Sequence, residues 1–346
     1  MGIVIDASAL LDSDRLPTID VRSPGEFSRG HIPSANNVPL LDDAERAEVG
    51  TIYNRSGSQP AITRGRELVS FKAEQLVETV KAIVSGPDLV VHCWRGGMRS
   101  QGFAGLLQQH GFRPRLLQGG YKAYRQAAHR CFAQPRRIII LSGHSGAGKT
   151  RLLNALRVTG EQVIDLERLA CHRGSVFGGI DQPPQPTVEQ FENDLFLQWR
   201  DLDPHKPVWI ESESQLIGRV FIPQAVWEQM STAAAIYVDV EREQRIQFLV
   251  DEYGDLPPDD LAKSIAKISK RLGGARLRVA LEALQRKDLH TFALIALEYY
   301  DKAYANSLQN SPREVVVKMP LSSPGEADAV EKLCQLGNEL TTAPAS

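Results

Sequence analysis

One segment of this 346-residue chain constrains the fold more than any other. Residues Gly143–Thr150 read GHSGAGKT and fit the pattern GxxxxGK[ST] without deviation. The apolar run 138–141 precedes the segment, and Leu152, Leu153 and Leu156 follow it with helical spacing. A strand, a glycine-rich loop and a helix in this order bind phosphate, because the loop N–H groups and the helix N-terminus point at the anion. The segment therefore predicts a phosphate-binding loop within an α/β sheet.

The ligand of this loop is expected to be a diphosphate or a nucleotide. Lys149 supplies a positive charge, and Thr150 is the kind of residue that holds Mg²⁺ beside a bound nucleotide. ATP or GTP is the generic ligand, but any diphosphate satisfies the same physics. The residues predicted to bind it are Gly143, Ser145, Gly146, Gly148, Lys149 and Thr150.

Further strand candidates alternate with helical segments, which is typical of a mostly parallel sheet. These candidates are residues 162–165, 208–211, 234–239 and 314–318 in the second part of the chain, and 17–21 and 88–92 in the first part. Residues 66–84 have helical spacing. We place a domain boundary before Pro135, which gives an N-terminal α/β domain over 1–134, a phosphate-binding α/β domain over 135–340 and a disordered tail over 341–346.

Composition excludes several classes of protein. Hydrophobic residues make up 42% and charged residues 24% of the chain, as in ordinary globular proteins. No apolar run approaches the roughly 20 residues that cross a bilayer, and the N-terminus lacks the features of a signal peptide. The four cysteines are far apart and include no CxxC pair, so neither a disulfide scaffold nor a structural metal site is expected. We therefore expect a cytoplasmic protein.

Acidic residues occur at the ends of two predicted strands near the phosphate-binding loop. Either pair could organise a metal ion or act on a substrate, although helix capping is an equally reasonable role for each carboxylate. A basic pair beside a Gly-Ser dipeptide follows the first of these strands and suits a substrate loop. The candidate substrate-binding or acid–base residues are Asp165, Glu167, His172, Arg173, Glu211 and Glu213.

A second loop with chemical potential follows the predicted strand 88–92. Cys93 stands at its base, and the residues expected to bind an anion beside it are Arg95, Gly96, Gly97 and Arg99. Loop N–H groups and arginines favour the thiolate, which is the reactive form of cysteine. A buried structural cysteine is the alternative, but such cysteines are not usually followed by Arg-Gly-Gly-x-Arg.

The spacing of this loop fits both Cys-dependent phosphatases and rhodaneses, which share a thiolate cradled by N–H groups. Residues 20–39 read DVRSPGEFSRGHIPSANNVP and closely resemble the rhodanese signature. Two departures are Ser34, where rhodaneses often carry glycine, and a cysteine loop one residue longer than in most of them. The longer loop leaves room for a larger anion, and cell-cycle phosphatases with the rhodanese fold have such a loop too.

Charge is distributed unevenly although the net charge is only −2. The 72 residues between Asp88 and Glu161 contain no acid and twelve cations. Such a window attracts polyanions. The cations expected to form a phosphate track, with the aromatics Phe112, Tyr121 and Tyr124 interleaved, are Arg113, Arg115, Lys122, Arg125, Arg130, Arg136 and Arg137.

Both halves of the chain together resemble the tRNA 2-selenouridine synthases over roughly residues 5–320. The segments that carry the resemblance are CWRGGMRS (93–100), GHSGAGKT (143–150), DLERLACHRGS (165–175) and ESESQLIG (211–218). The resemblance implies a rhodanese-like domain followed by a P-loop domain. It implies that wobble 2-thiouridine is first S-geranylated with geranyl diphosphate, and that selenium derived from selenophosphate then displaces the S-geranyl group.

The same resemblance implies that Cys93 carries the selenium, that the basic window binds tRNA, and that a selenophosphate-supplying enzyme is a transient partner. No tightly bound cofactor and no membrane partner are expected, and Mg²⁺ is expected only at the phosphate-binding loop. Taken generically, the two motifs also fit a sulfurtransferase coupled to an ATP-dependent kinase-like module. They are compatible as well with a Cys-dependent phosphatase and with a non-catalytic RNA-binding adaptor.

Overall fold

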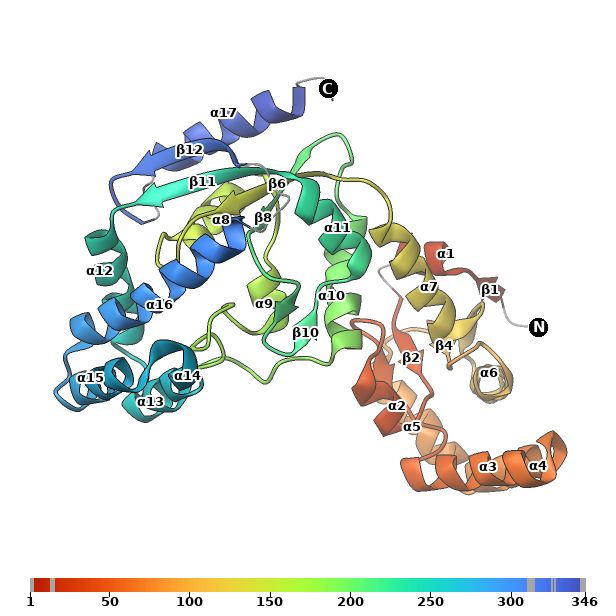
Figure 1. Ribbon diagram of the computed structural model, residues 1–346. Helices are drawn as coiled ribbons and strands as arrows, with labels where there is room; N and C mark the ends of the chain where they lie inside the picture. Colours follow the sequence, from red (N-terminus) through yellow and green to blue (C-terminus); the bar gives the residue numbers. More distant parts are fainter. Residues whose placement is uncertain (1–2, 13–15, 310–314, 325, 327, 343–346) are drawn as a thin grey trace. The chain divides into compact units, whose positions relative to one another are not determined.

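The computed structural model describes residues 3–12, 16–309, 315–324, 326 and 328–342, which form two compact units (Figure 1). The first unit comprises Met1–Cys131 together with Glu192–Leu197, and the second comprises Phe132–Phe191 and Gln198–Ser346. Within the described ranges each unit contains a five-stranded sheet in which all strands pair in parallel. The predicted α/β class is confirmed.

The sheet of the first unit has the strand order β1-β5-β4-β2-β3. Its strands are β1 (Ile3–Ile5), β2 (Thr18–Asp20), β3 (Asn36–Asn37), β4 (Asp88–His92) and β5 (Arg113–Leu117). Its helices are α1 (Ala7–Asp12), α2 (Pro24–Arg29), α3 (Asp43–Ser56), α4 (Ser58–Ser70), α5 (Ala73–Ile83), α6 (Met98–Gln109) and α7 (Gly120–Phe132). The two strands predicted in this part of the chain are present as β2 and β4.

The helix predicted over residues 66–84 is wrong as a single element, because α4 ends at Ser70 and α5 begins at Ala73. Phe71 between them is 88% exposed, so the apolar stripe is interrupted there. Apolar residues of α5 enter the core of the first unit, where Val77 and Val80 are buried against strand residues. In contrast, Ala61 is the one residue of α4 that is buried.

The sheet of the second unit has the order β12-β11-β6-β8-β7. Its strands are β6 (Arg137–Ser142), β7 (Gln162–Ile164), β8 (Pro207–Glu211), β11 (Ala234–Val240) and β12 (Val315–Leu321), and β9 (Leu216–Ile217) pairs antiparallel with β10 (Val220–Phe221). The predicted strands are therefore present, although Glu314 lies outside the described residues. None of the described helices is long and apolar enough to cross a membrane.

The helices of the second unit are α8 (Lys149–Val158), α9 (Leu166–Ala170), α10 (Val188–Arg200), α11 (Gln224–Thr232), α12 (Arg242–Tyr253), α13 (Pro258–Ala266), α14 (Ser269–Leu272), α15 (Gly274–Gln285), α16 (Leu289–Gln309) and α17 (Asp328–Thr342). Helices α8 and α17 share one apolar cluster with strands of the sheet, and α12 to α16 share another. Because α17 runs to Thr342, two residues of the expected tail are helical, and 343–346 lie outside the described residues. Strand β6 is central, so the loop after it lies where ligands of such sheets bind.

The boundary between the units differs from the expected division at residue 134. Residues Glu192–Leu197 of α10 belong to the first unit. The Asn193 side-chain N–H group donates to the carbonyl of His31 at 2.8 Å and to the Tyr121 hydroxyl at 2.7 Å. The ring of Phe196 packs edge-on against Tyr124, with centroids 5.3 Å apart. These contacts join residues far apart in sequence, so no local pattern indicates them.

Candidate functional site

The cysteine loop connects the end of β4 to the start of α6. Cys93 is 4% exposed, and its Sγ lies 3.3 Å from the Ser100 Oγ. Burial by itself raises the pKa of the thiol, but hydrogen bonds from Ser100 and from the backbone of Arg95, together with the charge of Arg99, bring the pKa below its ordinary value. The loop is therefore arranged to stabilise a thiolate, which an inert core cysteine does not need.

An ion pair fixes one arginine of this loop. Arg99 donates to both carboxylate oxygens of Glu26, at 2.6 and 3.2 Å. Burial raises the pKa of Glu26, but the hydrogen bond and charge of Arg99 outweigh it and the pKa ends below its usual range. Arg95 is exposed. Glu26 is a functional residue that the sequence analysis missed, although it lies within the signature segment 20–39.

Two glycines let the cysteine loop pack against the turn that precedes α7. Gly96 has φ +67°, and a Cβ there would lie 2.7 Å from the carbonyl oxygen of Leu117. A Cβ at Gly120 would lie 2.3 Å from the carbonyl oxygen of Cys93. Gly97, in contrast, is extended and stands at the N-cap of α6. The close packing against the turn before α7 holds the cysteine loop rigidly, so the N–H groups of the loop are preorganised.

The phosphate-binding loop connects β6 to α8, as the sequence predicts. Gly143, Gly146 and Gly148 all have positive φ, and a Cβ at Gly143 would lie 2.7 Å from the carbonyl of Val238. Lys149 donates to the carbonyl of Gly143 at 3.0 Å, so its ammonium group lies across the loop. Backbone conformation therefore favours glycine at all three positions, and lack of space also requires it at Gly143 and Gly146.

Residues of α12 and α16 brace this loop. The backbone N–H of Gly143 donates to the Tyr304 hydroxyl at 3.0 Å. Arg245 donates to the carbonyl of Ser145 at 3.2 Å and to Asp301 at 2.8 Å. The ring of His144 lies 3.2 Å from the same aspartate. The sequence analysis missed Tyr304, Arg245 and Asp301, because no motif marks them.

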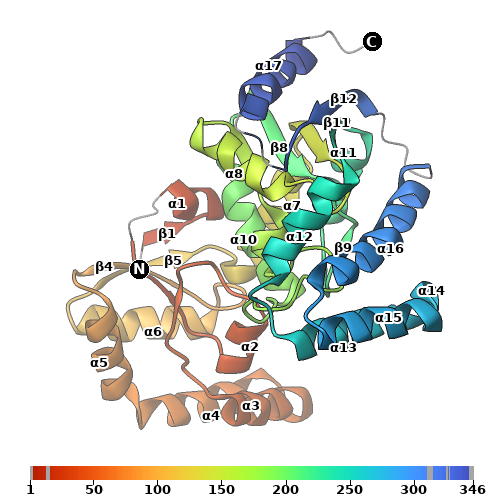
Figure 2. The ribbon, with the colours of Figure 1, turned by 90° about the vertical axis from the view of Figure 1, so that its left-hand side faces the viewer.

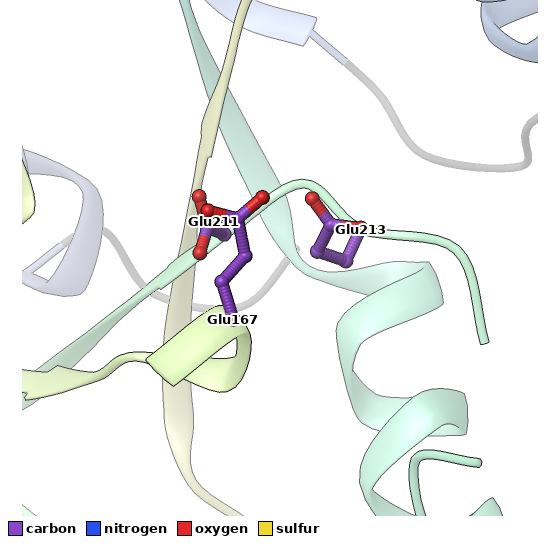
Figure 3. A group of neighbouring side chains, drawn as sticks. All are labelled: Glu167, Glu211 and Glu213. Carbon is purple, nitrogen blue, oxygen red and sulfur yellow. The ribbon is translucent and has the colours of Figure 1, made fainter. Parts of the chain in front are cut away.

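Three carboxylates of the second unit gather in one place (Figure 3). Glu167 on α9, Glu211 at the end of β8 and Glu213 each offer an oxygen, and these oxygens lie within 4.8 Å of one another. We call these three residues the carboxylate cluster. The Thr150 hydroxyl of the loop donates to Glu167 at 3.5 Å. The structure therefore brings together three of the six predicted substrate or acid–base residues.

Mutual repulsion and burial perturb this cluster. Burial, followed by the charge of Glu213, raises the pKa of Glu167 to about 8. Burial and the charge of Glu167 raise the pKa of Glu211 well above its usual value, and burial also raises that of Glu213. Glu211 is 1% exposed, and its Oε1 has no hydrogen-bond partner among the described residues. A divalent cation would satisfy this oxygen and neutralise the cluster.

The other three predicted residues have different surroundings. Asp165 is 3% exposed and caps α9 by accepting from the N–H of Arg168 at 2.8 Å, which is the capping role considered as its alternative. Burial lowers the pKa of the half-buried His172, and Arg173 is exposed. The loop that carries them reaches the carboxylate cluster through Gly174, where a Cβ would lie 2.7 Å from Glu213.

Both loops lie in segments of the chain that match known protein families. A rhodanese-like domain model matches residues 5–127, and a tRNA 2-selenouridine synthase AAA domain model matches residues 136–257. Curated proteins named tRNA 2-selenouridine synthase match nearly the whole chain. The Nitrosomonas europaea protein is 33% identical over 88% of this chain and 92% of its own, and the Shewanella denitrificans protein 35% identical over 87% and 91%. The chain belongs to the tRNA 2-selenouridine synthase family. A Bdellovibrio bacteriovorus family member is 36% identical over 89% of this chain and 86% of its own.

Membership in the tRNA 2-selenouridine synthase family confirms the predicted family, the enzyme class and the order of the two domains. The cysteine loop therefore belongs to a rhodanese-like domain. The phosphatase alternative took its support from that loop alone, and the matches over both halves of the chain leave it without support.

The seven cations predicted to contact nucleic acid are not equally available. The exposed ones are Arg113, Lys122, Arg130 and Arg137, and the half-buried ones are Arg115, Arg125 and Arg136. Arg113 pairs with Asp88, and Arg125 pairs with Glu192 of α10. Tyr121 and Tyr124 are fully buried, so they cannot stack on bases as interleaved surface aromatics would.

Proposed function

We propose that this protein converts wobble 2-thiouridine of tRNA into 2-selenouridine in two steps, with geranyl diphosphate and selenophosphate as co-substrates. Family membership supports the overall conversion. The observation that carries the two-step form is the presence, in one chain, of a thiolate loop and a separate phosphate-binding loop. A selenium transfer alone would need the first loop only, and the second provides a place for a diphosphate.

In the first step, the thiouridine sulfur attacks the geranyl carbon while the carbon–oxygen bond to diphosphate breaks. The diphosphate oxygen keeps the electron pair, so the reaction needs positive charge where the diphosphate leaves. Lys149 supplies one charge, and the loop N–H groups donate to the phosphate oxygens. The carboxylate cluster and Thr150 fit Mg²⁺, and a bound Mg²⁺ would neutralise part of the leaving diphosphate.

In the second step, carbon 2 of the base accepts selenium and the carbon–sulfur bond breaks. Alkylation has turned the sulfur into a better leaving group, because it departs as a geranyl thiolate with its electron pair. Cys93 carries this selenium as a selenosulfide: the P–Se bond of selenophosphate breaks with phosphate going to water, a small-molecule disulfide accepts the two electrons lost when the S–Se bond forms, and a small-molecule thiol returns them when the S–Se bond breaks and the selenium attacks carbon 2. Arg99, the exposed Arg95 and the N–H groups at Gly96 and Gly97 hold the phosphate of the donor. Selenophosphate is supplied by a separate enzyme that meets this protein transiently.

The tRNA backbone binds to the exposed cations of the basic window. Lys122 and Arg130 lie on α7, at opposite ends of the same helix, and both are exposed. Phosphate contacts of this kind position the substrate without reading its sequence. The wobble base is then read by groups close to Cys93 or to the loop at His172.

Mass spectrometry of nucleosides tests the proposal directly. The full chain is incubated with tRNA that contains 2-thiouridine, first with geranyl diphosphate and then with selenophosphate. We expect S-geranyl-2-thiouridine after the first addition and 2-selenouridine after the second. Formation of 2-selenouridine at the same rate without geranyl diphosphate would contradict the two-step route. Strong, tRNA-stimulated ATP hydrolysis would instead favour a sulfurtransferase coupled to a kinase-like module.

A further inference from the structure

A cavity of about 840 Å³ opens in the first unit beside the cysteine loop. Its walls come from the α3–α4 hairpin, whose two helices lie side by side, and from α6 (Figure 2). The interior is mainly apolar and is lined by Leu41, Val49, Ile62, Val69, Phe103 and Leu106. A volume of this size is typical of small-molecule sites in proteins.

Little of the α3–α4 hairpin is covered by the rest of the first unit. None of the residues of α3 is buried, and Ala61 is the only buried residue of α4. Two large apolar side chains that line the cavity are exposed, Tyr53 by 58% and Met98 by 61%. Apolar residues of a surface helix normally face a core, so an apolar ligand is the natural partner of this surface.

Part of the lining of the cavity is cationic, and one of its arginines acts on the reactive thiol. Arg99 lines the cavity, and its charge also lowers the pKa of Cys93. Arg46 lines the cavity as well and lies 3.7 Å from Glu26, the carboxylate that holds Arg99. The lining thus combines cationic groups close to the cysteine loop with a mainly apolar surface. This polarity fits an apolar chain that is attached to a nucleotide of an anionic RNA.

We propose that the cavity binds the geranyl chain of S-geranyl-2-thiouridine during the selenium step. The inference rests on the two-step function proposed above and names the site of its second substrate. The cavity shares Arg99 with the cysteine loop, so the occupant that it fits is the alkylated RNA, the substrate of the selenium step. The cavity forms no bond. It holds the ten-carbon chain so that carbon 2 of the base, which bears the S-geranyl group, faces Cys93, and the geranyl thiol leaves through it.

Two glycines of α6 provide a matched test. Gly102 lines the cavity, and a Cβ there would meet no atom within 4 Å. Gly102→Phe should therefore fill the cavity without a clash, and Gly102→Ala should leave it open while favouring the helix. Gly105 has equally open space but is not among the lining residues. Gly105→Phe therefore controls for a bulky ring on the same helix.

Binding of two anticodon stem-loop RNAs to the full chain measures the effect. One RNA carries S-geranyl-2-thiouridine and the other S-methyl-2-thiouridine. Burial of the longer chain predicts that the wild type prefers the geranyl RNA on the order of 10- to 100-fold. Gly102→Phe should reduce this preference by about tenfold or more, while Gly102→Ala and Gly105→Phe retain it. A wild type without preference, or a preference that Gly102→Phe leaves intact, overturns the proposal.

A second readout separates this proposal from the function on which it rests. With selenophosphate, Gly102→Phe should raise the KM for the geranyl RNA, and its S-geranylation of 2-thiouridine RNA should stay near the wild-type rate. If the wild type converts no geranyl RNA to 2-selenouridine, the two-step function fails, and the binding preference still decides the cavity. If the wild type converts it and Gly102→Phe does so with an unchanged KM, the cavity proposal alone fails.

Discussion

The loops after β4 and β6 have the same strand–loop–helix design but opposite electrostatic surroundings. Beside the first loop, Arg99 and N–H groups lower the pKa of Cys93, so the protein stabilises an anion of its own. Beside the second, the carboxylate cluster faces Lys149 and has raised pKa values. The difference shows that loop geometry alone does not fix chemistry. The first loop is prepared for a nucleophilic atom, and the second accumulates negative charge that a cation must balance.

The largest effect should come from the residue that makes the first loop reactive. Cys93→Ser keeps the shape and polarity but cannot form a bond between two chalcogen atoms. We expect selenium incorporation to fall by a factor on the order of 10³ or more, a scale typical of losing a catalytic nucleophile. S-geranylation should persist, because it needs no thiol. Mass spectrometry of nucleosides measures both products.

Cys131→Ser is the matched control for this change, since Cys131 is a half-buried cysteine outside the loop. Its rates should equal those of the wild type. A Cys93→Ser variant that still makes 2-selenouridine at the wild-type rate would show that Cys93 does not carry the selenium. The first loop would then not be the nucleophilic one of the two.

A somewhat smaller effect should follow from removing the cation of the second loop. Lys149→Ala should slow S-geranylation by about 10²-fold, comparable to the loss of one group that stabilises developing charge. RNA that already carries the geranyl group should then be selenated at the wild-type rate. If Lys149→Ala also fails to convert this pre-alkylated RNA to 2-selenouridine, Lys149 serves both steps. The two loops would then not have separate roles.

The carboxylate cluster predicts how stability depends on pH. Folding raises the pKa of Glu167 from 4.5 to about 8, so the folded state keeps protons that the unfolded state has lost. The free energy of unfolding should therefore fall as the pH rises from about 4.5 to about 8. Glu211→Gln removes a carboxyl group whose ionised form folding disfavours, and it should be more stable than the wild type at pH 8 by about 1–2 kcal/mol.

Thermal melts at several pH values measure this dependence, with the exposed Glu228→Gln as the control. Millimolar Mg²⁺ should raise the Tm of the wild type at pH 8 and have less effect on Glu211→Gln, because the ligand set is incomplete. If Mg²⁺ raises the Tm of both proteins equally, the carboxylate cluster does not bind the cation.

The smallest effect should come from the surface cations of the first unit. Lys122→Gln and Arg130→Gln should each lower the log–log salt slope of tRNA affinity by about 0.7 to 0.9 if each cation contacts one phosphate. Lys81→Gln, which pairs with Glu78 on α5, should leave the slope unchanged. An unchanged slope in all three variants would mean that tRNA does not bind along α7.

Local patterns in the sequence predict the strands and both loops, because a run of apolar residues and a spacing of glycines are local properties. They do not predict the groups that tune the loops. Glu26 meets Arg99 across 73 positions of sequence, and Tyr304 meets Gly143 across 161. Apolar periodicity also predicted one helix where the structure has α4 and α5, because the spacing of apolar residues does not show where the chain changes direction. Ser34 stands where rhodaneses often carry glycine, and its φ of +67° is a conformation that glycine adopts more readily.

The contribution of α10 to the first unit affects how the chain can fold on the ribosome. Domains usually fold as they emerge, N-terminal domain first. Here the hydrogen bonds from Asn193 to Tyr121 and to the His31 carbonyl can form only after β6 and β7 have been synthesised. The nascent first unit therefore remains incomplete while the second unit has already begun to appear. A gene truncated after Cys131 would encode a rhodanese-like fragment with those partners missing, so recombination between relatives should preserve both halves together.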